Sequence, residues 1–281
     1  MKIMITGANG QLGQEFIRLV GKKHALYPYS RQELDITSKH MVYQIVKKTK
    51  PDIILHCAAF TKVDQCEDEI VKAIEVNSVG TFNVAKVARE ISADLVYFSS
   101  DYVFDGKKQT PYTEEDNPNP LSIYGKTKFF GEEFVKAVHP KSYIIRTSWV
   151  YGQNGSNFVN TMLSLAEQGK TVKVVNDQVG SPTCTYDLAE KVLQLLGKSY
   201  GIYHIANQGK CSWYEFAREI FKVAGYDPEK VIPISSKEYG ASAIRPSFSV
   251  LGQGALDREG LEKTKNWKVA LSEFLRRRNN D

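Results

Sequence analysis

Two periodicities alternate along the first half of the chain. Short apolar runs of strand length occupy residues 2–6, 25–29, 52–56, 94–99 and 143–147. Between them lie stretches whose apolar residues recur at helical spacing, at residues 11–20, 38–48, 70–91 and 123–138. This alternation is typical of βαβ units, whose right-handed crossovers place helices on both faces of a parallel sheet. The pattern therefore predicts an α/β fold with a doubly wound parallel sheet.

The spacing changes after Trp149. A polar, glycine-rich stretch at 151–157 is followed by predicted helices at 158–168, 186–196, 213–224 and 268–277 and by short strands at 172–175 and 202–204. We interpret this half as completing the sheet and adding a small lobe. The expected units are a domain over residues 1–150 and a lobe over residues 151–281. Because no linker separates them, we expect a cleft between them at the carboxyl ends of the strands.

Composition and charge are those of an ordinary globular protein. Of the 281 residues, 42% are hydrophobic and 25% charged, with 37 basic and 32 acidic side chains, which excludes disorder, collagen and coiled coil. The basic runs at 47–50 and 276–278 are interpreted as solvated faces, so we expect no nucleic-acid partner.

The cysteines and the N-terminal residues indicate the cellular compartment of the protein. Cys57, Cys66, Cys184 and Cys211 form no CxxC pair, which favours free thiols in a reducing compartment. No stretch approaches the roughly 18 apolar residues that span a bilayer, and residues 1–6 lead into Gly7 without a cleavage signal. We expect a cytoplasmic protein with no membrane partner.

The first strand is followed at once by a glycine-rich turn. In Gly7-Ala8-Asn9-Gly10-Gln11-Leu12-Gly13 the first glycine permits a sharp turn, the second a close approach to a diphosphate, and the third close packing of helix on strand. The helix N-terminus then offers free N–H groups to phosphates. The residues of this loop predict a dinucleotide-binding domain of the Rossmann type.

Residues at the end of the second strand indicate whether the cofactor carries a phosphate on its 2′ ribose position. An acid there would accept from the ribose hydroxyls of NAD, whereas this strand ends at Tyr29-Ser30-Arg31, with no acid before Glu33. The Arg31 guanidinium suits a 2′-phosphate, which favours NADPH. Use of NADH stays open.

Three Tyr-x-x-x-Lys pairs are candidates for a proton donor tuned by a nearby cation, namely Tyr43/Lys47, Tyr124/Lys128 and Tyr226/Lys230. The first lies within a predicted helix far from any strand end, and the third in a turn. Only Tyr124 opens the helix after the fourth strand, which delivers Ser100 to the sheet edge beside the glycine loop. We predict a site in which Ser100 holds a carbonyl oxygen, Tyr124 donates a proton, and Lys128 lowers the pKa of Tyr124 and reaches the nicotinamide ribose.

With these motifs the chain resembles the extended short-chain dehydrogenase/reductase superfamily, and within it the dTDP-4-dehydrorhamnose reductases. The resemblance runs nearly end to end and is carried by residues 7–13, 34–37, 51–64, 76–78, 99–106, 124–128, 146–151 and 177–183, with Arg245-Pro246 and Trp267. It implies NADPH-dependent reduction of the C4 ketone of dTDP-4-dehydro-L-rhamnose to dTDP-L-rhamnose, a nucleotide-sugar partner, and a monomer or homodimer.

The resemblance also implies residue roles. Cofactor contacts fall on Asp35 and Ile36 at the adenine, and on Ala58, Ala59 and Thr61; sugar-nucleotide contacts fall on Val63, Ser100, Asp101, Tyr102, Trp149 and Asn157. The family usually has Thr where this chain has Ser100, which keeps the hydroxyl but loses the methyl group that restricts its rotamer. Some members dimerise through magnesium. Glu15 and Glu190 are acids at plausible positions, but the tail 276–281 shows no clear third ligand, so we predict no metal site.

Two other functions stay open. A dehydratase or epimerase on the same scaffold would be expected to carry two adjacent acids after the hydroxyl residue, whereas Ser100 is followed by Asp101 and then Tyr102. A non-catalytic NADP-binding regulatory subunit, resembling that of methionine adenosyltransferase, would place no chemical demand on Ser100, Tyr124 and Lys128.

Overall fold

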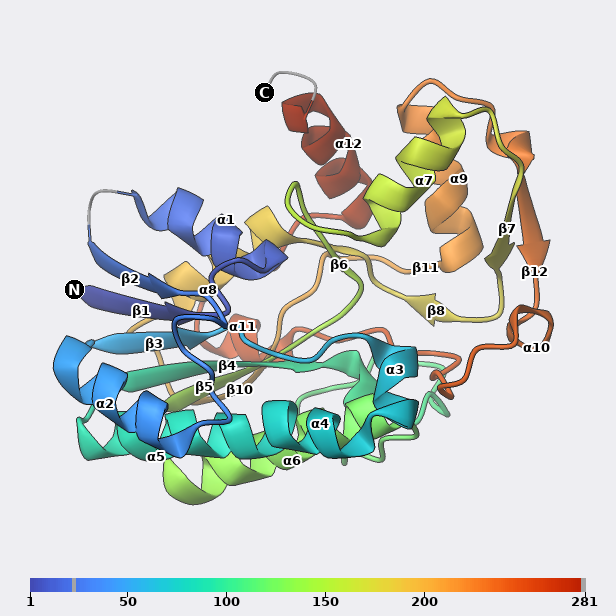
Figure 1. Ribbon diagram of the computed structural model, residues 1–281. Coiled ribbons are helices and arrows are strands. Elements are labelled where there is room, and N and C mark those ends of the chain that lie inside the picture. The colour runs from blue at the N-terminus through green and yellow to red at the C-terminus, as the bar shows by residue number, and fades with distance from the viewer. Residues whose placement is uncertain (22–23, 279–281) are drawn as a thin grey trace.

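Six parallel strands form the central sheet of the computed structural model, which describes residues 1–21 and 24–278. Their order is β10-β5-β4-β3-β1-β2 (Figure 1). The strands are β1 (Lys2–Thr6), β2 (Ala25–Tyr29), β3 (Ile53–His56), β4 (Asp94–Ser100), β5 (Ser142–Thr147) and β10 (Gly201–His204). The predicted doubly wound parallel sheet is confirmed, and the last strand comes from the second half of the chain.

Helices cover both faces of this sheet (Figure 1). On one face lie α1 (Gln11–Val20) and α8 (Thr185–Leu195), and on the other α2 (Lys39–Thr49), α5 (Thr81–Glu90) and α6 (Ile123–Val138). Side chains of a strand alternate between the faces. Phe98 packs in the cluster that contains α1 and α8, whereas Tyr97 packs in the cluster that contains α2 and α5.

The continuous helix predicted over residues 70–91 is wrong. The structure has α3 (Val63–Asp68), α4 (Ile70–Ile74), a π-helical turn (Glu75–Gly80) and then α5. Asn77 in that turn accepts from the backbone N–H of Phe60 at 2.7 Å and donates to its carbonyl at 3.0 Å. This exchange with a distant loop fixes the wider turn, and apolar spacing contains no signal for it.

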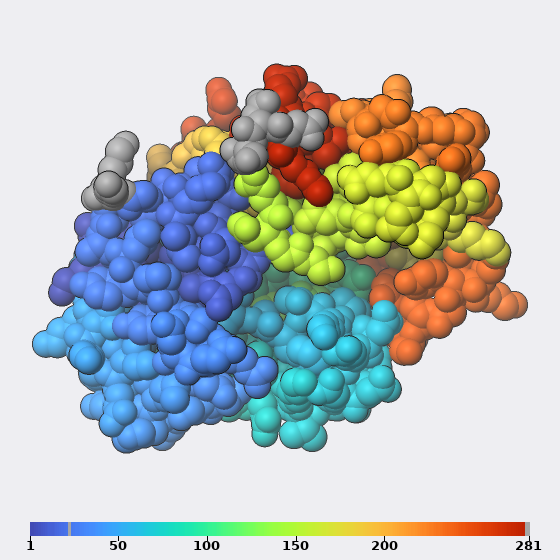
Figure 2. Space-filling model, turned by 45° about the horizontal axis from the view of Figure 1, so that its top comes forward, coloured from blue at the N-terminus to red at the C-terminus, as the bar shows by residue number. Residues whose placement is uncertain are grey.

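The second half of the chain builds a lobe beyond the carboxyl ends of the strands (Figure 1). Its elements are β6 (Val150–Tyr151), α7 (Phe158–Glu167), β7 (Val172–Val175), β8 (Val179–Gly180), β9 (Thr183–Cys184), β11 (Cys211–Ser212), α9 (Trp213–Val223), β12 (Val231–Ile234), α10 (Ser236–Tyr239) and α12 (Trp267–Arg278). The short helix α11 (Gly254–Arg258) packs instead in the core of the sheet, beside β10. Tyr151, Phe216 and Trp267 lie in the lobe's own buried cluster. Figure 2 shows the molecule with the top of Figure 1 brought forward. In this view a recess lies between the lobe (yellow-green to red) and the first half of the chain (blue to cyan).

A buried ion pair connects the sheet to helix α6. Arg146 on β5 donates to Glu132 on α6 at 2.7 and 2.9 Å, and both side chains are almost fully buried. Ser99 on β4 donates to the same carboxylate at 2.5 Å. Strands β4 and β5 are thereby tied to the helix that begins at residue 123.

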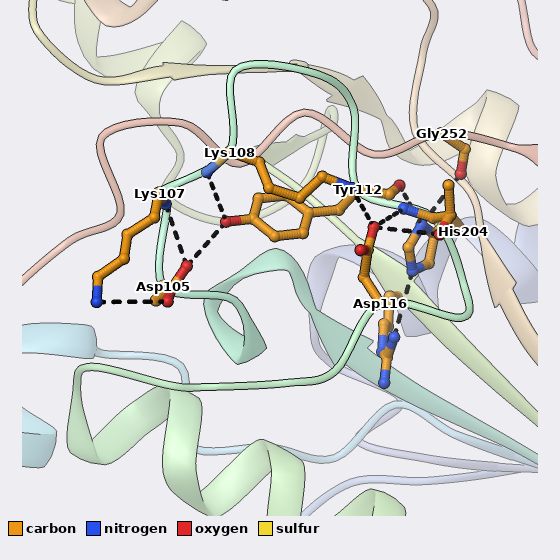
Figure 3. A network of polar contacts seen from close by, with 9 residues as sticks. Asp105, Lys107, Lys108, Tyr112, Asp116, His204 and Gly252 are labelled. Carbon is orange, nitrogen blue, oxygen red and sulfur yellow. Dashed lines mark hydrogen bonds and ion pairs between the residues drawn. The ribbon is translucent and has the colours of Figure 1, made fainter.

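The loop after β4 is held by a second polar network (Figure 3). Tyr112 donates its phenol hydrogen to Asp105 at 3.0 Å, and His204 on β10 lies within hydrogen-bond distance of the carbonyls of Tyr112 and Gly252. Burial, with the charge of Arg146, lowers the pKa of His204 to about 3. The imidazole is therefore neutral at physiological pH and ties loop, sheet and lobe together.

Candidate active site

The glycine loop leaves the N-terminus of α1 open. Gly7 has φ +66°, and a Cβ atom there would lie 2.7 Å from Cα of Ala58. At Gly13 a Cβ would lie 2.5 Å from the carbonyl oxygen of Gly7. Gly10 caps α1 without a side-chain hydrogen bond. Backbone N–H groups at an uncapped helix start, with no side chain in front of them, suit a diphosphate.

A cavity of about 360 Å³ extends from this loop toward β2. Eight predicted cofactor residues line it, namely Gly7, Asn9, Gly10, Arg31, Asp35, Ile36, Ala58 and Ala59. The same wall also contains six residues that were not predicted from the sequence, namely Gln32, Leu34, Cys57, Phe60, Lys72 and Val76. The donor set and the absence of side chains at the glycines fit the adenosine diphosphate half of a dinucleotide.

Arg31 and Glu33 behave differently at this cavity. The Glu33 carboxylate accepts from the backbone N–H and the hydroxyl of Ser30, at 2.8 and 2.7 Å, and these bonds lower its pKa. Glu33 is thus bound to the end of its own strand, while the exposed Arg31 lines the cavity. The Glu33 carboxylate is already hydrogen-bonded within the chain, whereas the Arg31 guanidinium is available to bind a phosphate.

A second cavity, of about 450 Å³, brings the predicted catalytic residues together. Predicted residues in its wall are Gly10, Gln11, Leu12, Gly13, Ala59, Thr61, Val63, Ser100, Asp101, Tyr102, Tyr124, Lys128, Trp149 and Asn157. The missed residues are His56, Cys57, Phe98, Ser99, Thr147, Ser148, Val150, Ser156 and Trp213. Gly10, Cys57 and Ala59 line both cavities, so the two adjoin along the strand ends.

Local structure places Tyr124 at the start of α6. Ser122 caps this helix by accepting from the backbone N–H of Gly125 at 3.1 Å, and a Cβ at Gly125 would collide with the carbonyl of Tyr102. The rings of Tyr102 and Tyr124 meet edge to face with centroids 5.6 Å apart. The phenol is thereby directed at the end of β4, where the hydroxyl of Ser100 hydrogen-bonds it.

The predicted lowering of the Tyr124 pKa by Lys128 stays a prediction, because burial and groups other than Lys128 set that pKa in this structure. Burial is the largest effect on Tyr124 and raises its pKa, with Ser100 offsetting part of the increase. Burial also lowers the pKa of Lys128 to about 7, against the opposing charge of Glu132, and its Nζ lies 4.4 Å from the ring centre of Tyr97. Desolvation outweighs the attraction that the motif suggests. The phenol consequently stays protonated at neutral pH, as a proton donor must.

Trp149 forms an aromatic wall with a residue that sequence analysis missed. Its ring stacks on Trp213 with centroids 3.6 Å apart, and Trp149 has φ +47°. A Cβ at Gly180 would lie 2.6 Å from the Trp149 ring, so that position admits only glycine. Trp213 opens α9 behind a Ser212/Glu215 capping box. The predicted helix over residues 213–224 therefore begins at the right residue, and the S-x-x-E pattern is its signal in the sequence, but nothing there indicates that the Trp213 ring lines the cavity.

Asn157 joins the lobe to the glycine loop. Its side-chain amide donates to Gln11 at 3.0 Å and to the carbonyl of Gly152 at 2.8 Å, while its oxygen caps α7. The predicted sugar-side residue therefore sits where the two halves of the chain meet.

The two acids considered for magnesium have other partners. Glu15 binds Arg18 and accepts from the hydroxyl of Thr185 at 3.1 Å, and Glu190 accepts from Tyr186 at 3.4 Å. Over residues 1–21 and 24–278, no group of three or more His, Cys, Asp or Glu is arranged to hold a metal ion. The end of the tail that was considered for a third ligand, residues 279–281, lies outside the described residues.

The described helices include none that is both long and apolar enough to cross a membrane. All four cysteines, each within the described ranges, are unpaired.

Residues 1–280 match the family model of the RmlD substrate binding domain. The chain belongs to the RmlD substrate-binding family. It is 40% identical to the dTDP-4-dehydrorhamnose reductase of Mycolicibacterium smegmatis over 98% of this chain and 85% of that protein. It is 43% identical to the spore coat polysaccharide biosynthesis protein SpsK of Bacillus subtilis, over 99% and 98% of the two chains. The predicted family resemblance is confirmed.

Solved structures agree with this membership. A dTDP-4-dehydrorhamnose reductase from Bacillus anthracis, in complex with NADP, superposes with a TM-score of 0.96 at 43% identity, covering 98% of this chain and 99% of that one. A UDP-glucose 4-epimerase from Thermus thermophilus superposes at 0.85 with 19% identity, which shows the shared fold alone.

Proposed function

We propose that this chain is an NADPH-dependent reductase that converts the C4 ketone of dTDP-4-dehydro-L-rhamnose to the alcohol of dTDP-L-rhamnose. The observation that carries the proposal is the meeting of Ser100, Tyr124 and Lys128 in one cavity that adjoins the glycine loop. The names of the relatives above and the NADP in the Bacillus anthracis structure support the choice of substrate and cofactor.

The cofactor, when bound, supplies the hydride. Tyr124 donates a proton to the ketone oxygen, and Ser100 donates a hydrogen bond to the same oxygen. Both donors act where negative charge develops, so they stabilise the transition state more than the bound ketone. Lys128, with Glu132 behind it, supplies positive charge for the phenolate that Tyr124 becomes.

The other residues that line the two cavities bind the cofactor or the nucleotide sugar in this proposal. Gly7, Gly10 and Gly13 with the start of α1 bind the diphosphate, and Arg31 binds the 2′-phosphate. Asp35, Ile36, Ala58, Ala59 and Thr61 line the path of the cofactor; Val63, Asp101, Tyr102, Trp149 and Asn157 contact the nucleotide sugar. We place the protein in the cytoplasm, where nucleotide sugars and NADPH are made, as a monomer or homodimer.

The test is oxidation of NADPH, followed at 340 nm, with the dTDP-4-keto sugar as substrate. Steady, stoichiometric consumption supports the reductase. A dehydratase or epimerase recycles its bound cofactor and would consume none, and a regulatory subunit would bind NADPH without oxidising it.

Arg31→Ala is expected to weaken NADPH binding about tenfold, because a charge-assisted contact to the 2′-phosphate contributes roughly 1.4 kcal/mol or more. Fluorescence titration measures this, and NADH serves as the internal control because it lacks that phosphate. Equal weakening for both cofactors would contradict the assignment of Arg31.

Gly7→Ala is expected to reduce NADPH affinity at least about tenfold, because the new methyl group collides with Ala58 and displaces the loop. Gly225→Ala is the matched control. Gly225 has φ +83°, and a Cβ there meets nothing within 4 Å. The control carries the backbone strain alone and should bind NADPH normally; a parallel loss in both variants would show that strain, not the collision, decides the effect.

A further inference from the structure

Asp101 is a buried carboxyl group within reach of the proposed catalytic residues. It follows Ser100 at the end of β4 and is only 1% exposed. One carboxyl oxygen accepts from the hydroxyl of Ser100 at 3.1 Å, and the other accepts from the hydroxyl of Ser249 at 2.6 Å. Ser249 is itself buried and lies in the chain segment before α11. The carboxyl group is therefore hydrogen-bonded by one serine from each half of the chain.

The surroundings of Asp101 disfavour a negative charge. In the described part of the chain it forms no ion pair, and the titratable groups facing it are the phenols of Tyr102 and Tyr124. Arg245 reaches Tyr102 but is paired with Asp64, and Lys128 lines the same cavity beside Tyr97. Burial raises the pKa of Asp101 to about 7, with the hydrogen bonds of Ser249 and Ser100 opposing the increase. Both protonation states are therefore populated at neutral pH.

The hydrogen-bond capacity of Ser100 links this carboxyl to the reaction. A serine hydroxyl has one hydrogen to donate and two lone pairs. One lone pair already accepts from the backbone N–H of Tyr102 at 3.2 Å. The phenol of Tyr124 also bonds this hydroxyl, and in the proposed reaction that phenol turns to the ketone oxygen when the substrate binds. When Asp101 is ionised, the single hydrogen of Ser100 is donated to the carboxylate. When Asp101 is protonated, its O–H can donate to the second lone pair, which frees the hydrogen of Ser100 for the ketone oxygen.

We propose that Asp101 is a positioning residue whose protonation turns the Ser100 hydroxyl toward the ketone oxygen. The inference rests on the proposed reductase function and deepens it. A neutral carboxyl also removes a second negative charge from beside the oxygen on which charge develops, and in a buried site that repulsion is large. Neutral carboxylic acids that support an oxyanion are a known device of enzyme sites.

Turnover requires protonated Asp101, so kcat falls as the pH rises through its pKa. Lys128, which must stay charged, contributes a falling limb in the same range. The ratio of a variant's kcat to that of the unmodified protein cancels the Lys128 contribution and isolates Asp101.

Two variants test the proposal. Asp101→Asn keeps the neutral arrangement, with the amide oxygen at Ser249 and the amide N–H at Ser100. Its kcat ratio to the unmodified protein is expected to rise about tenfold per pH unit above pH 8, because only the unmodified protein loses its neutral carboxyl. Ser249→Ala removes a bond that lowers the Asp101 pKa and is expected to move that limb about one pH unit higher.

A matched control and an activity-free measurement complete the test. Ser247→Ala lies two residues from Ser249, loses a bond to the carbonyl of Gly106 instead, and should leave the pH profile unchanged. In 13C NMR of aspartate-labelled protein, one carboxyl should titrate near pH 7, move upward in Ser249→Ala and be missing in Asp101→Asn.

Constant kcat ratios from pH 6 to 9 for both variants would overturn the proposal, as would an Asp101 carboxyl that titrates near pH 4. If Asp101→Asn does not fold, Ser249→Ala and the NMR titration still decide. Absence of NADPH oxidation by the unmodified protein at every pH would instead contradict the reductase function itself.

Discussion

Tyr124→Phe is expected to fold, to bind NADPH and to lose about 10²–10⁴-fold in turnover, the range that a general acid contributes. The variant removes only the phenol oxygen, so the edge-to-face contact with Tyr102 and the cap of α6 remain. Burial favours the protonated form of this phenol, which is the form that donates in the proposed reaction. Initial rates of NADPH oxidation and a fluorescence titration with NADPH measure the two halves of the prediction.

Tyr43→Phe is the matched control for this experiment. Tyr43 precedes Lys47 at the same four-residue spacing, but it is half exposed on α2, where Lys47 lies over its ring at 5.4 Å. Its loss should leave turnover unchanged. If Tyr124→Phe kept turnover within a factor of ten, Tyr124 would not be the proton donor.

The largest expected loss of stability comes from Glu132→Gln. This change leaves the Arg146 guanidinium buried without its counter-charge, and breaking such a pair costs about 3–5 kcal/mol. Ser99 loses its charged acceptor in the same step. The charge of Glu132 also raises the pKa of Lys128, which is about 7, so removal of that charge should lower this pKa. Urea unfolding measures the stability change, and the kcat profile measures the shift of the Lys128 limb to lower pH.

Two comparisons show whether burial is the cause. Glu133→Gln, one residue along α6, breaks an exposed pair with Lys136 and should cost under about 1 kcal/mol. Adding Arg146→Met to Glu132→Gln removes the unpaired charge and should recover part of the loss. Equal costs for Glu132→Gln and Glu133→Gln would contradict this account of the pair.

The sheet was predictable because its signals are local. The five strands of the first half agree with the structure to within a residue or so at each end, since each is a short apolar run bounded by turns. The interruption at Asn77 and the two-residue strands of the lobe were not predictable, because partners distant in the sequence determine them. Apolar periodicity contains no information about such partners.

The candidate active site was likewise predictable only in part. The glycine loop and the Ser100, Tyr124 and Lys128 set follow from motif spacing and chain order. The protonation of Tyr124 and Lys128 does not, because it depends on how much solvent the folded chain excludes. Trp213 was missed for a related reason, since its part in the cavity depends on the fold of the lobe, although its helix start is marked in the sequence.

The stacked indoles of Trp149 and Trp213 give this protein a built-in optical probe. The chain has three tryptophans, and the third, Trp267, is buried in the lobe core. Two of the three emitters therefore border the second cavity, so arrival of a nucleotide sugar there should change the intrinsic emission without any attached dye. Occupancy of that cavity can then be followed in real time, even in variants that no longer turn over.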